Sequence, residues 1–222
     1  MKTALITGTS RGIGRALAER FIKEGWRVLG TAVSGLNIPD SPSFKGYDLD
    51  LSSPQSIGSL CDALISEGVT IDLLVNNAGV CEDDFTDKVI SEKLRETFEV
   101  NVFGLADLTE RLSSQVSDGG QIFNMSSTAG MLSKDLRVFN YPSYKMSKAA
   151  LNMYTRILAG RLSQRGIFVA SIHPGWVKTD MGGGEADLSP EEAAGYIYEF
   201  AAKVKPLSDT GLFWFKGERL PW

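Results

Sequence analysis

Short apolar runs alternate along the chain with longer segments in which apolar side chains recur every three or four residues. The longer segments have the period of helices with one buried face. They predict helices over 13–24, 53–68, 91–116, 141–163 and 189–204. The short runs are apolar at successive positions and predict strands over 2–7, 26–32, 43–50, 71–79, 119–127, 166–175 and 211–217.

Strands that are apolar throughout are expected where helices cover both faces of a sheet. The alternation of strand and helix therefore predicts an α/β fold with a doubly wound, mostly parallel sheet and helices on both faces. The chain has 222 residues, of which 43% are apolar, which is enough for one substantial core. Because no repeat, low-complexity linker or break in composition interrupts it, residues 1–222 are predicted to form a single domain.

Composition and charge narrow the classes of function. The net charge is −4 without a run of lysine or arginine, so binding to nucleic acid or anionic lipid is not expected. The apolar runs are far shorter than the roughly 20 residues of a membrane-spanning helix, and the first residues lack the pattern of a secretory signal. Cys61, Cys81 and His173 are too few for a disulfide framework or a Cys/His metal site. We expect a soluble, cytoplasmic protein without a metal.

A glycine-rich segment, TGTSRGIG, lies between the first predicted strand and the first predicted helix. Gly8 allows a sharp turn, and Gly12 and Gly14 allow the backbone to approach a phosphate group at the amino end of the helix. The spacing differs from the general G-x-G-x-x-G dinucleotide fingerprint. These residues alone therefore leave two interpretations open, a phosphate-binding loop or a simple turn.

Tyr144 and Lys148 are four residues apart, so on a helix their side chains share a face. An unperturbed tyrosine has a pKa of about 10 and transfers protons poorly near neutrality. A neighbouring ammonium favours the phenolate and is expected to lower that pKa, which would make Tyr144 a proton donor. The alternative for this pair alone is an exposed helix turn with an ordinary surface lysine.

The motifs occur in the order seen in the short-chain dehydrogenase/reductase superfamily, which the chain resembles over nearly its whole length. They are the glycine segment 7–14, NNAG at 76–79, Ser127, YKMSK at 144–148 and HPGWVKTDM at 173–181. The short chain, HPGWVKTDMGG and the ending GLFWFKGERLPW are most similar to the C-factor-like carbonyl reductase branch. The resemblance implies one Rossmann-type domain that carries both the cofactor site and the catalytic site. It also implies a homodimer or homotetramer, joined through the long helices that carry Asn101 and Tyr144.

The resemblance implies four catalytic residues, Asn101, Ser127, Tyr144 and Lys148. Ser127 is chosen over Ser126 and Ser133 because the second serine of NMSSTAG takes the catalytic position in the superfamily. Ser127 precedes Tyr144 by 17 residues, more than in many relatives, and the extra residues are expected to remodel the pocket wall. Asn101 interrupts an apolar stretch, so it is either a satisfied core amide, a support for a proton relay toward Lys148, or both.

The resemblance also implies the residues that contact a nicotinamide cofactor. They are Gly8, Ser10, Arg11, Gly12, Ile13, Gly14, Ser34, Asp50, Leu51, Asn77, Ala78, Gly79, Tyr144, Lys148, Pro174, Gly175, Val177 and Thr179. NADP(H) is favoured over NAD(H), because no acidic residue follows the second strand before Asp40 and Arg11 can pair with a 2′-phosphate. Asp50 has a second interpretation as a helix cap or turn residue ahead of Pro54.

Together these expectations describe an NADPH-dependent oxidoreductase that reduces a small aldehyde or ketone to an alcohol. Hydride transfer would be accompanied by proton donation from Tyr144, with Ser127 stabilising the carbonyl oxygen. The alternative from another class is a nucleotide-binding signalling protein of the C-factor type with little or no turnover. The sequence does not identify the substrate.

Overall fold

The computed structural model describes residues 1–36, 38–83, 85–133, 139–203 and 205–222. Its centre is an eight-stranded sheet in the order β3-β2-β1-β4-β5-β6-β7-β8, in which all neighbouring strands are parallel except β7 and β8. The strands are β1 Thr3–Ile6, β2 Arg27–Ala32, β3 Phe44–Asp48, β4 Ile71–Asn76, β5 Val116–Met125, β6 Phe168–Ile172, β7 Leu212–Phe215 and β8 Glu218–Leu220. The predicted doubly wound, mostly parallel sheet is confirmed.

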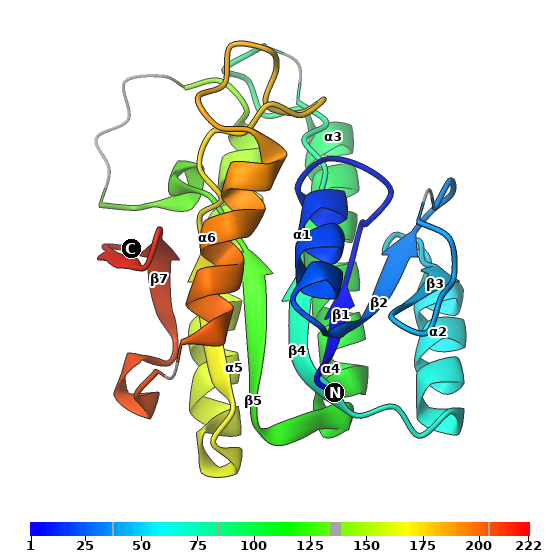
Figure 1. The fold of residues 1–222 in the computed structure, drawn as a ribbon. Coiled ribbons are helices and arrows are strands. Elements are labelled where there is room, and N and C mark those ends of the chain that lie inside the picture. The colour runs from blue at the N-terminus through cyan, green and yellow to red at the C-terminus, as the bar shows by residue number, and fades with distance from the viewer. Residues whose placement is uncertain (37, 84, 134–138, 204) are drawn as a thin grey trace.

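Helices cover both faces of the sheet (Figure 1). On one face, α1 (Gly12–Lys23) and α6 (Pro190–Ala202) pack against each other and against the sheet. On the other face lie α2 (Pro54–Ser66), α4 (Leu105–Leu112) and α5 (Pro142–Leu162). The last predicted helix ends in the structure at Ala202, and Val204 lies outside the described residues.

The central strands β1, β4 and β6 are largely apolar because each supplies side chains to two cores. In β1, Leu5 faces the core under α2, α4 and α5, whereas Ile6 faces the core under α1 and α6. Leu5 lies in register with Leu29 of β2 and Leu74 of β4, and all three are fully buried. Successive side chains of a strand point to opposite faces, so burial on both faces removes the usual alternation with polar residues.

The last two strands of the chain form a hairpin at one edge of the sheet, and the hydrophobic pattern did not predict it. β7 corresponds to the predicted closing strand, and β8 returns antiparallel to it after a two-residue turn. Both turn residues, Lys216 and Gly217, have positive φ angles of 51° and 79°. This is the backbone geometry that joins two twisted strands tightly. Because β8 has only three residues, it leaves no run from which hydrophobicity could predict a strand.

The long helix predicted over 91–116 is divided and ends earlier. It comprises α3 (Ser91–Phe98), a π-helical segment (Glu99–Gly104) and α4, followed by a 3-10 turn (Ser113–Gln115), and Val116 already belongs to β5. A π turn holds one extra residue, and such turns are frequent at functional sites. At its end, a Cβ atom on Gly104 would lie 1.8 Å from the carbonyl oxygen of Leu51, so only glycine permits this close approach of two backbones. The hydrophobic period continues through all three parts, which is why it predicted one helix.

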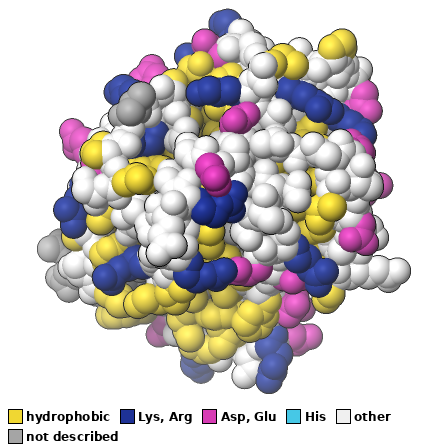
Figure 2. Space-filling model, turned by 90° about the horizontal axis from the view of Figure 1, so that it is seen from below, with side chains coloured by type: hydrophobic (Ala, Val, Ile, Leu, Met, Phe, Trp, Pro, Cys, Tyr) yellow, Lys and Arg dark blue, Asp and Glu magenta, His cyan; other side chains and the backbone are white. Residues whose placement is uncertain are grey.

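Among the helices of the described residues, none is long and apolar enough to cross a membrane. Figure 2, which shows the molecule from below, has Lys and Arg side chains interspersed with Asp and Glu rather than gathered into one basic patch.

Replacing Gly104 tests the close approach between the π segment and Leu51. We expect Gly104→Ala to lower the free energy of unfolding by about 3 kcal/mol, because the new methyl group meets a backbone carbonyl that has no rotamer to change. The matched control is Gly195→Ala in α6, where a Cβ atom meets nothing within 4 Å. It should raise the free energy of unfolding by about 0.5–1 kcal/mol. Urea unfolding followed by circular dichroism measures both, and equal effects of the two substitutions would contradict the packing argument.

Candidate active site

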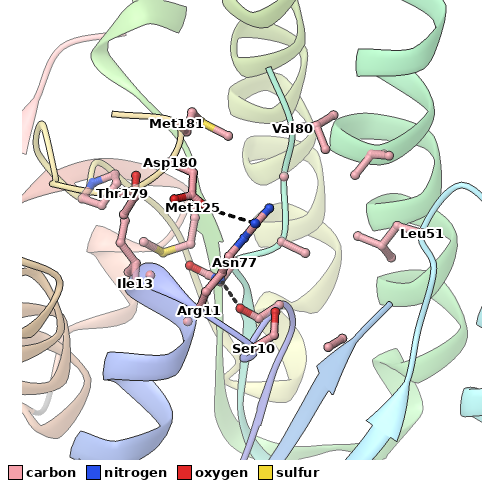
Figure 3. A pocket seen from close by; sticks show the side chains of 18 of the residues that line it. Ser10, Arg11, Ile13, Leu51, Asn77, Val80, Met125, Thr179, Asp180 and Met181 are labelled. Atoms are coloured by element: carbon pink, nitrogen blue, oxygen red, sulfur yellow. Dashed lines mark hydrogen bonds and ion pairs between the residues drawn. The ribbon is translucent and has the colours of Figure 1, made fainter. Parts of the chain in front are cut away.

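A cleft of about 670 Å³ lies at the carboxyl ends of the central strands (Figure 3). Its walls come from the β1–α1 loop, from the ends of β2, β4 and β5, and from the loop between β6 and α6. The strand order reverses at β1 and β4, and ligands of open parallel sheets bind at such a switch point. The topology therefore places a binding cleft where the predicted motifs meet.

The glycine loop gives this cleft a backbone cradle at the amino end of α1. Gly8 and Gly12 have φ angles of 75° and 55°, which favour glycine. A Cβ atom on Gly14 would lie 2.0 Å from the carbonyl oxygen of Gly8, so the first turn of α1 packs directly on the loop. No side chain caps the amino end of α1, and the cradle fits the phosphate groups of a dinucleotide.

The NNAG segment holds the glycine loop in place. The backbone N–H groups of Asn77 and Ala78 both donate to Oγ1 of Thr7 at 2.9 Å. The Asn77 side-chain amide donates to the carbonyl oxygens of Thr7 at 2.8 Å and Gly8 at 3.3 Å. The pair of asparagines thus serves as more than a turn, because one of them joins the end of β4 to the loop after β1.

The other asparagine, Asn76, begins a buried chain of polar side chains beneath the cleft. Its amide donates to Oγ1 of Thr109 at 2.9 Å and to Oδ1 of Asn124 at 2.8 Å. Asn124 then donates to Oγ1 of Thr155 at 2.9 Å, which also receives the hydroxyl of Ser171 at 2.9 Å. This chain links β4, α4, β5, α5 and β6, and sequence reasoning did not assign it a role. The feature of the sequence that could have indicated this chain is the presence of polar residues at the ends of apolar strands.

Tyr144 and Lys148 lie on α5 at the inner end of the cleft. The Ser127 hydroxyl hydrogen-bonds the Tyr144 phenol. The Lys148 ammonium lies 5.4 Å from the centre of the Tyr144 ring and donates to the carbonyl oxygen of Met125 at 2.9 Å. Three of the four predicted catalytic residues are therefore close together, although Ser127, unlike Tyr144 and Lys148, does not line the cleft.

Of the three serines considered, only Ser127 has its hydroxyl on the tyrosine. The Ser126 hydroxyl donates to Oδ1 of Asn152 at 2.6 Å, and Ser133 is exposed, with its backbone N–H donating to the carbonyl oxygen of Trp222. Ser127 begins a short turn that packs directly on α5, where a Cβ atom on Gly130 would lie 2.6 Å from the Lys148 backbone. The predicted insertion between Ser127 and Tyr144 lies partly outside the described residues, at 134–138.

Asn101 lies in the π segment, fully buried, and does not line the cleft. Its side chain exchanges two hydrogen bonds of 2.8 Å with the backbone of Val80 and donates to the Ser147 hydroxyl at 3.1 Å. It is therefore a satisfied core amide. A Cβ atom on Gly79 would lie 3.1 Å from Oδ1 of Asn101 and 3.5 Å from Nζ of Lys148, so Gly79 keeps open the space between these two groups.

The electrostatics of the tyrosine differ from the prediction. Burial raises the pKa of Tyr144 to about 12, and the hydrogen bond from Ser127 opposes this only in part. Burial also lowers the pKa of Lys148 to about 8. The expected lowering of the tyrosine pKa by Lys148 is therefore wrong for the protein groups alone, because the ammonium lies over the ring and binds a backbone carbonyl. The phenol is held in its protonated form.

Most of the predicted cofactor contacts line the cleft. These are Gly8, Ser10, Arg11, Gly12, Ile13, Gly14, Ser34, Leu51, Asn77, Ala78, Gly79, Tyr144, Lys148, Pro174 and Thr179. Asp50 does not: its carboxylate accepts hydrogen bonds from the Ser52 backbone at 2.8 Å and hydroxyl at 2.6 Å. Asp50 therefore has the turn interaction of its second interpretation, and its contact with the cofactor stays a prediction. Gly175 and Val177 also lie outside the lining, where they pack against Leu188.

The sequence matches the model of the short chain dehydrogenase family over residues 2–188. The chain belongs to this family. It is 32% identical over 208 residues to the 3-oxoacyl-[acyl-carrier-protein] reductase of Salmonella typhimurium, a match that covers 90% of this chain and 82% of the relative.

Two solved short-chain dehydrogenase structures are similar over all of this chain. The NADPH-bound carbonyl reductase from chicken fatty liver has 27% identity, a TM-score of 0.90 and 94% coverage of its own chain. The NADP-bound dehydrogenase/reductase from Burkholderia multivorans has 29% identity, a TM-score of 0.86 and 99% coverage. The predicted superfamily is confirmed, and the carbonyl reductase in this comparison agrees with the narrower resemblance.

Sequence reasoning missed several residues of this short-chain dehydrogenase that line the cleft. They are Thr31, Ala32, Val33, Leu49, Val80, Val100, Met125, Ser126, Lys178, Asp180, Met181 and Pro190. Half of them lie at the end of β2, β3 or β5 or directly after it, and these places were predictable even though the side chains carry no motif. It also missed Asp83, whose carboxylate accepts a 2.9 Å hydrogen bond from the Tyr144 backbone N–H. Within the described residues, no three His, Cys, Asp or Glu side chains gather as a metal site would require.

The buried ammonium makes a prediction for the stability of this dehydrogenase. Because the folded pKa of Lys148 is about 8 and its ordinary value is 10.5, the unfolded chain binds more protons between these values. Unfolding should therefore become harder as pH rises through this window, by about 3 kcal/mol at roughly 1.4 kcal/mol per pKa unit. Lys148→Met should lose this gain, whereas exposed Lys178→Met should retain it. Urea unfolding at pH 7.5 to 10 measures the three slopes, and parallel slopes for all three proteins would contradict the burial argument.

Proposed function

We propose that the protein reduces the carbonyl group of a small aldehyde or ketone to an alcohol with NADPH. The observation that carries this proposal is Tyr144 beside Lys148 in the lining of a cleft that fits a dinucleotide, with the Ser127 hydroxyl acting on the phenol from just outside that lining. The similarity to the chicken carbonyl reductase over the whole chain supports the choice of a simple carbonyl. We expect the reaction to occur in the cytoplasm, where the free thiols of Cys61 and Cys81 stay reduced.

The proposed cofactor is NADP(H) rather than NAD(H). The end of β2 presents Ala32, Val33 and Ser34 to the cleft, without the carboxylate that usually binds a 2′-hydroxyl. Arg11 is an exposed guanidinium in the same cleft and can bind a phosphate with two hydrogen bonds. The two similar structures with NADPH or NADP bound support this choice.

The reaction requires a hydride and a proton on opposite ends of the carbonyl bond. The nicotinamide, when bound, supplies the hydride to the carbonyl carbon. Tyr144 gives its proton to the carbonyl oxygen, and Ser127 donates a hydrogen bond to that oxygen as negative charge develops. A proton from solvent then restores the phenol, so that the protein is unchanged and an alcohol has formed.

Lys148 and Asn101 support this proton transfer. With a pKa of about 8, Lys148 is mainly protonated at pH 7, and its positive charge lies 5.4 Å from the centre of the Tyr144 ring during the proton transfer. The resemblance also assigns its ammonium to the ribose hydroxyls of the cofactor. Asn101 positions Val80 and Ser147, and we assign it the support of the proton route toward Lys148 past Gly79.

A second candidate is the reduction of a 3-oxoacyl thioester. The identity to the Salmonella 3-oxoacyl-[acyl-carrier-protein] reductase supports it, and the same hydroxyl pair would serve both reactions. An NADPH-oxidation screen that includes simple aldehydes, ketones, quinones and acetoacetyl thioesters separates the two candidates. A preference for the thioester in kcat/KM would favour the second. Stoichiometric binding of NADPH without turnover of any carbonyl would favour the signalling interpretation.

Replacement of the two hydroxyl groups tests the proposed chemistry. We expect Tyr144→Phe to lower kcat by about 10³-fold and Ser127→Ala by about 10²-fold, since one removes the proton donor and the other a stabilising hydrogen bond. The Kd for NADPH should change less than twofold in both. Tyr154→Phe is the control on the same helix, because its hydroxyl binds Glu110 outside the cleft and its loss should leave kcat intact. Substantial carbonyl reduction by Tyr144→Phe would rule out the assigned proton donor.

We also propose that the protein forms a homodimer or homotetramer through the outer face of α5. Met153 and Ile157 are four residues apart on this face and 55% and 53% exposed, and Phe103 of the π segment is 57% exposed. Hydrophobic side chains also gather at the lower edge of the view in Figure 2. A second copy of the chain is the partner that the resemblance implies for these helices.

A charge on α5 tests this assembly. Ile157→Glu should convert the oligomer to monomers, because a carboxylate is costly to bury in an apolar interface. Light scattering coupled to size-exclusion chromatography gives the mass, and circular dichroism confirms the fold. The matched control is Ile65→Glu on α2, where the isoleucine is 47% exposed on a different helix. A monomeric parent protein, or an Ile157→Glu variant with the parent mass, would reject the proposed interface.

A further inference from the structure

The cleft contains a carboxylate that the proposed reaction does not use. Among the described residues that line it, Arg11, Lys148 and Lys178 are cationic, and Asp180 is the single acidic residue. A negative charge opposes the entry of a ligand that carries several phosphates. Oδ2 of Asp180 lies 2.8 Å from Nη1 of Arg11, the guanidinium assigned above to the 2′-phosphate. The Asp180 carboxylate is therefore paired with the guanidinium to which the 2′-phosphate of the proposed cofactor would bind.

Arg11 stands between two sites that lie on opposite sides of β1. The sheet order places β2 on one side of β1, and β4, β5 and β6 on the other. A substituent at the 2′ position is recognised at the end of β2 in folds of this class. Asp180 belongs to the loop after β6, and Figure 3 shows Arg11 extended across the cleft to it. In this position the guanidinium is directed away from the strand end where the 2′-phosphate is expected.

The pair is weak enough to be exchanged. The side chains of Arg11 and Asp180 are 80% and 74% exposed, so water and salt screen their attraction. The loops that carry them are already in contact, since a Cβ atom on Gly12 would lie 3.2 Å from Cγ2 of Thr179. Arg11 can therefore leave Asp180 by side-chain rotation while the two loops stay together. A phosphate, with more charge than a carboxylate, is the stronger competitor for the guanidinium.

We propose that Asp180 is a specificity-determining residue that competes with the 2′-phosphate of NADP(H) for Arg11. NAD(H) has a hydroxyl at this position and leaves the ion pair intact, whereas NADP(H) must displace Asp180. Asp180 thus makes the preference for NADP(H) over NAD(H) smaller than Arg11 alone would make it. The inference rests on the proposed cofactor, and it is independent of the carbonyl substrate.

Direct binding measurements test this competition. The fluorescence of bound NADPH and NADH gives the Kd of each cofactor, at low ionic strength and without turnover. Asp180→Asn keeps the shape and removes the charge, and it should increase the ratio of NADH Kd to NADPH Kd by about two- to fivefold. The upper value is the affinity equivalent of about 1 kcal/mol, the most that an exposed ion pair usually contributes. Asp180→Ala should act in the same direction.

Two further variants separate competition from simple repulsion. Asp187→Asn removes a charge from the same loop outside the cleft lining, and it should leave the ratio unchanged. In an Arg11→Gln background, Asp180→Asn should no longer change the ratio, because the residue for which the two anions compete is gone. Thermal unfolding confirms that each variant is folded.

Three results would overturn the proposal. An equal gain for NADPH and NADH in Asp180→Asn would show that the carboxylate only repels phosphates in general. A weaker binding of NADPH would show that Asp180 positions Arg11 for the phosphate instead of withholding it. A change of the ratio that persists in the Arg11→Gln background would exclude Arg11 as the shared partner. If the folded parent protein bound neither cofactor, the proposed function itself would fail, which is a different outcome from these three.

Discussion

The hydrogen-bonded chain from Asn76 through Asn124 and Thr155 to Ser171 is the constraint on which the active site depends. Both faces of the sheet are covered by apolar cores, so a buried polar group that lacks a partner is costly. At the strand ends, this requirement ties β4, β5 and β6 to α5. These hydrogen bonds determine the distance between α5, which carries Tyr144, and the end of β5, which Ser127 follows.

The same constraint explains how a lysine is held in the interior. Lys148 is 5% exposed, and burial of its ammonium opposes folding. Its partner is the carbonyl oxygen of Met125, the last residue of β5, and Asn124 beside it belongs to the polar chain. The strand that receives the ammonium is therefore positioned by the chain of hydrogen bonds. Burial of Lys148 lowers the stability of the fold. The chain of hydrogen bonds keeps the Met125 carbonyl oxygen in a fixed position to receive the ammonium.

The sequence was sufficient for the fold wherever a pattern had one physical cause. Burial on both faces makes a strand largely apolar, and this predicted the central strands β1, β4 and β6 most directly. The hairpin strand β8 and the π segment escaped, because one is too short for a pattern and the other keeps the helical period. Asp50 shows a different limit. An aspartate suits a turn as well as a ligand, and the hydrogen bonds to Ser52 show the first role without testing the second.

The site was predictable as a set of motifs but not as an electrostatic system. The motifs identified Tyr144 and Lys148 as neighbours, yet the direction of the tyrosine pKa depends on burial and on what the ammonium binds. A pKa of about 12 suits the proposed direction of reaction. A phenol that stays protonated at neutral pH is ready to donate, and the alkoxide that forms during reduction is basic enough to accept its proton.

The charged residues of the cleft fall into two groups that differ in burial, and this difference separates two tasks. Lys148 is buried on the sheet and is coupled through Met125 to the strands, so a change there disturbs both folding and chemistry. Arg11 and Asp180 are exposed on two loops and belong to neither apolar core. Cofactor preference can therefore vary at the rim while the proton donor stays in place. A fold with both faces of its sheet buried allows this, because only its loops are free to change.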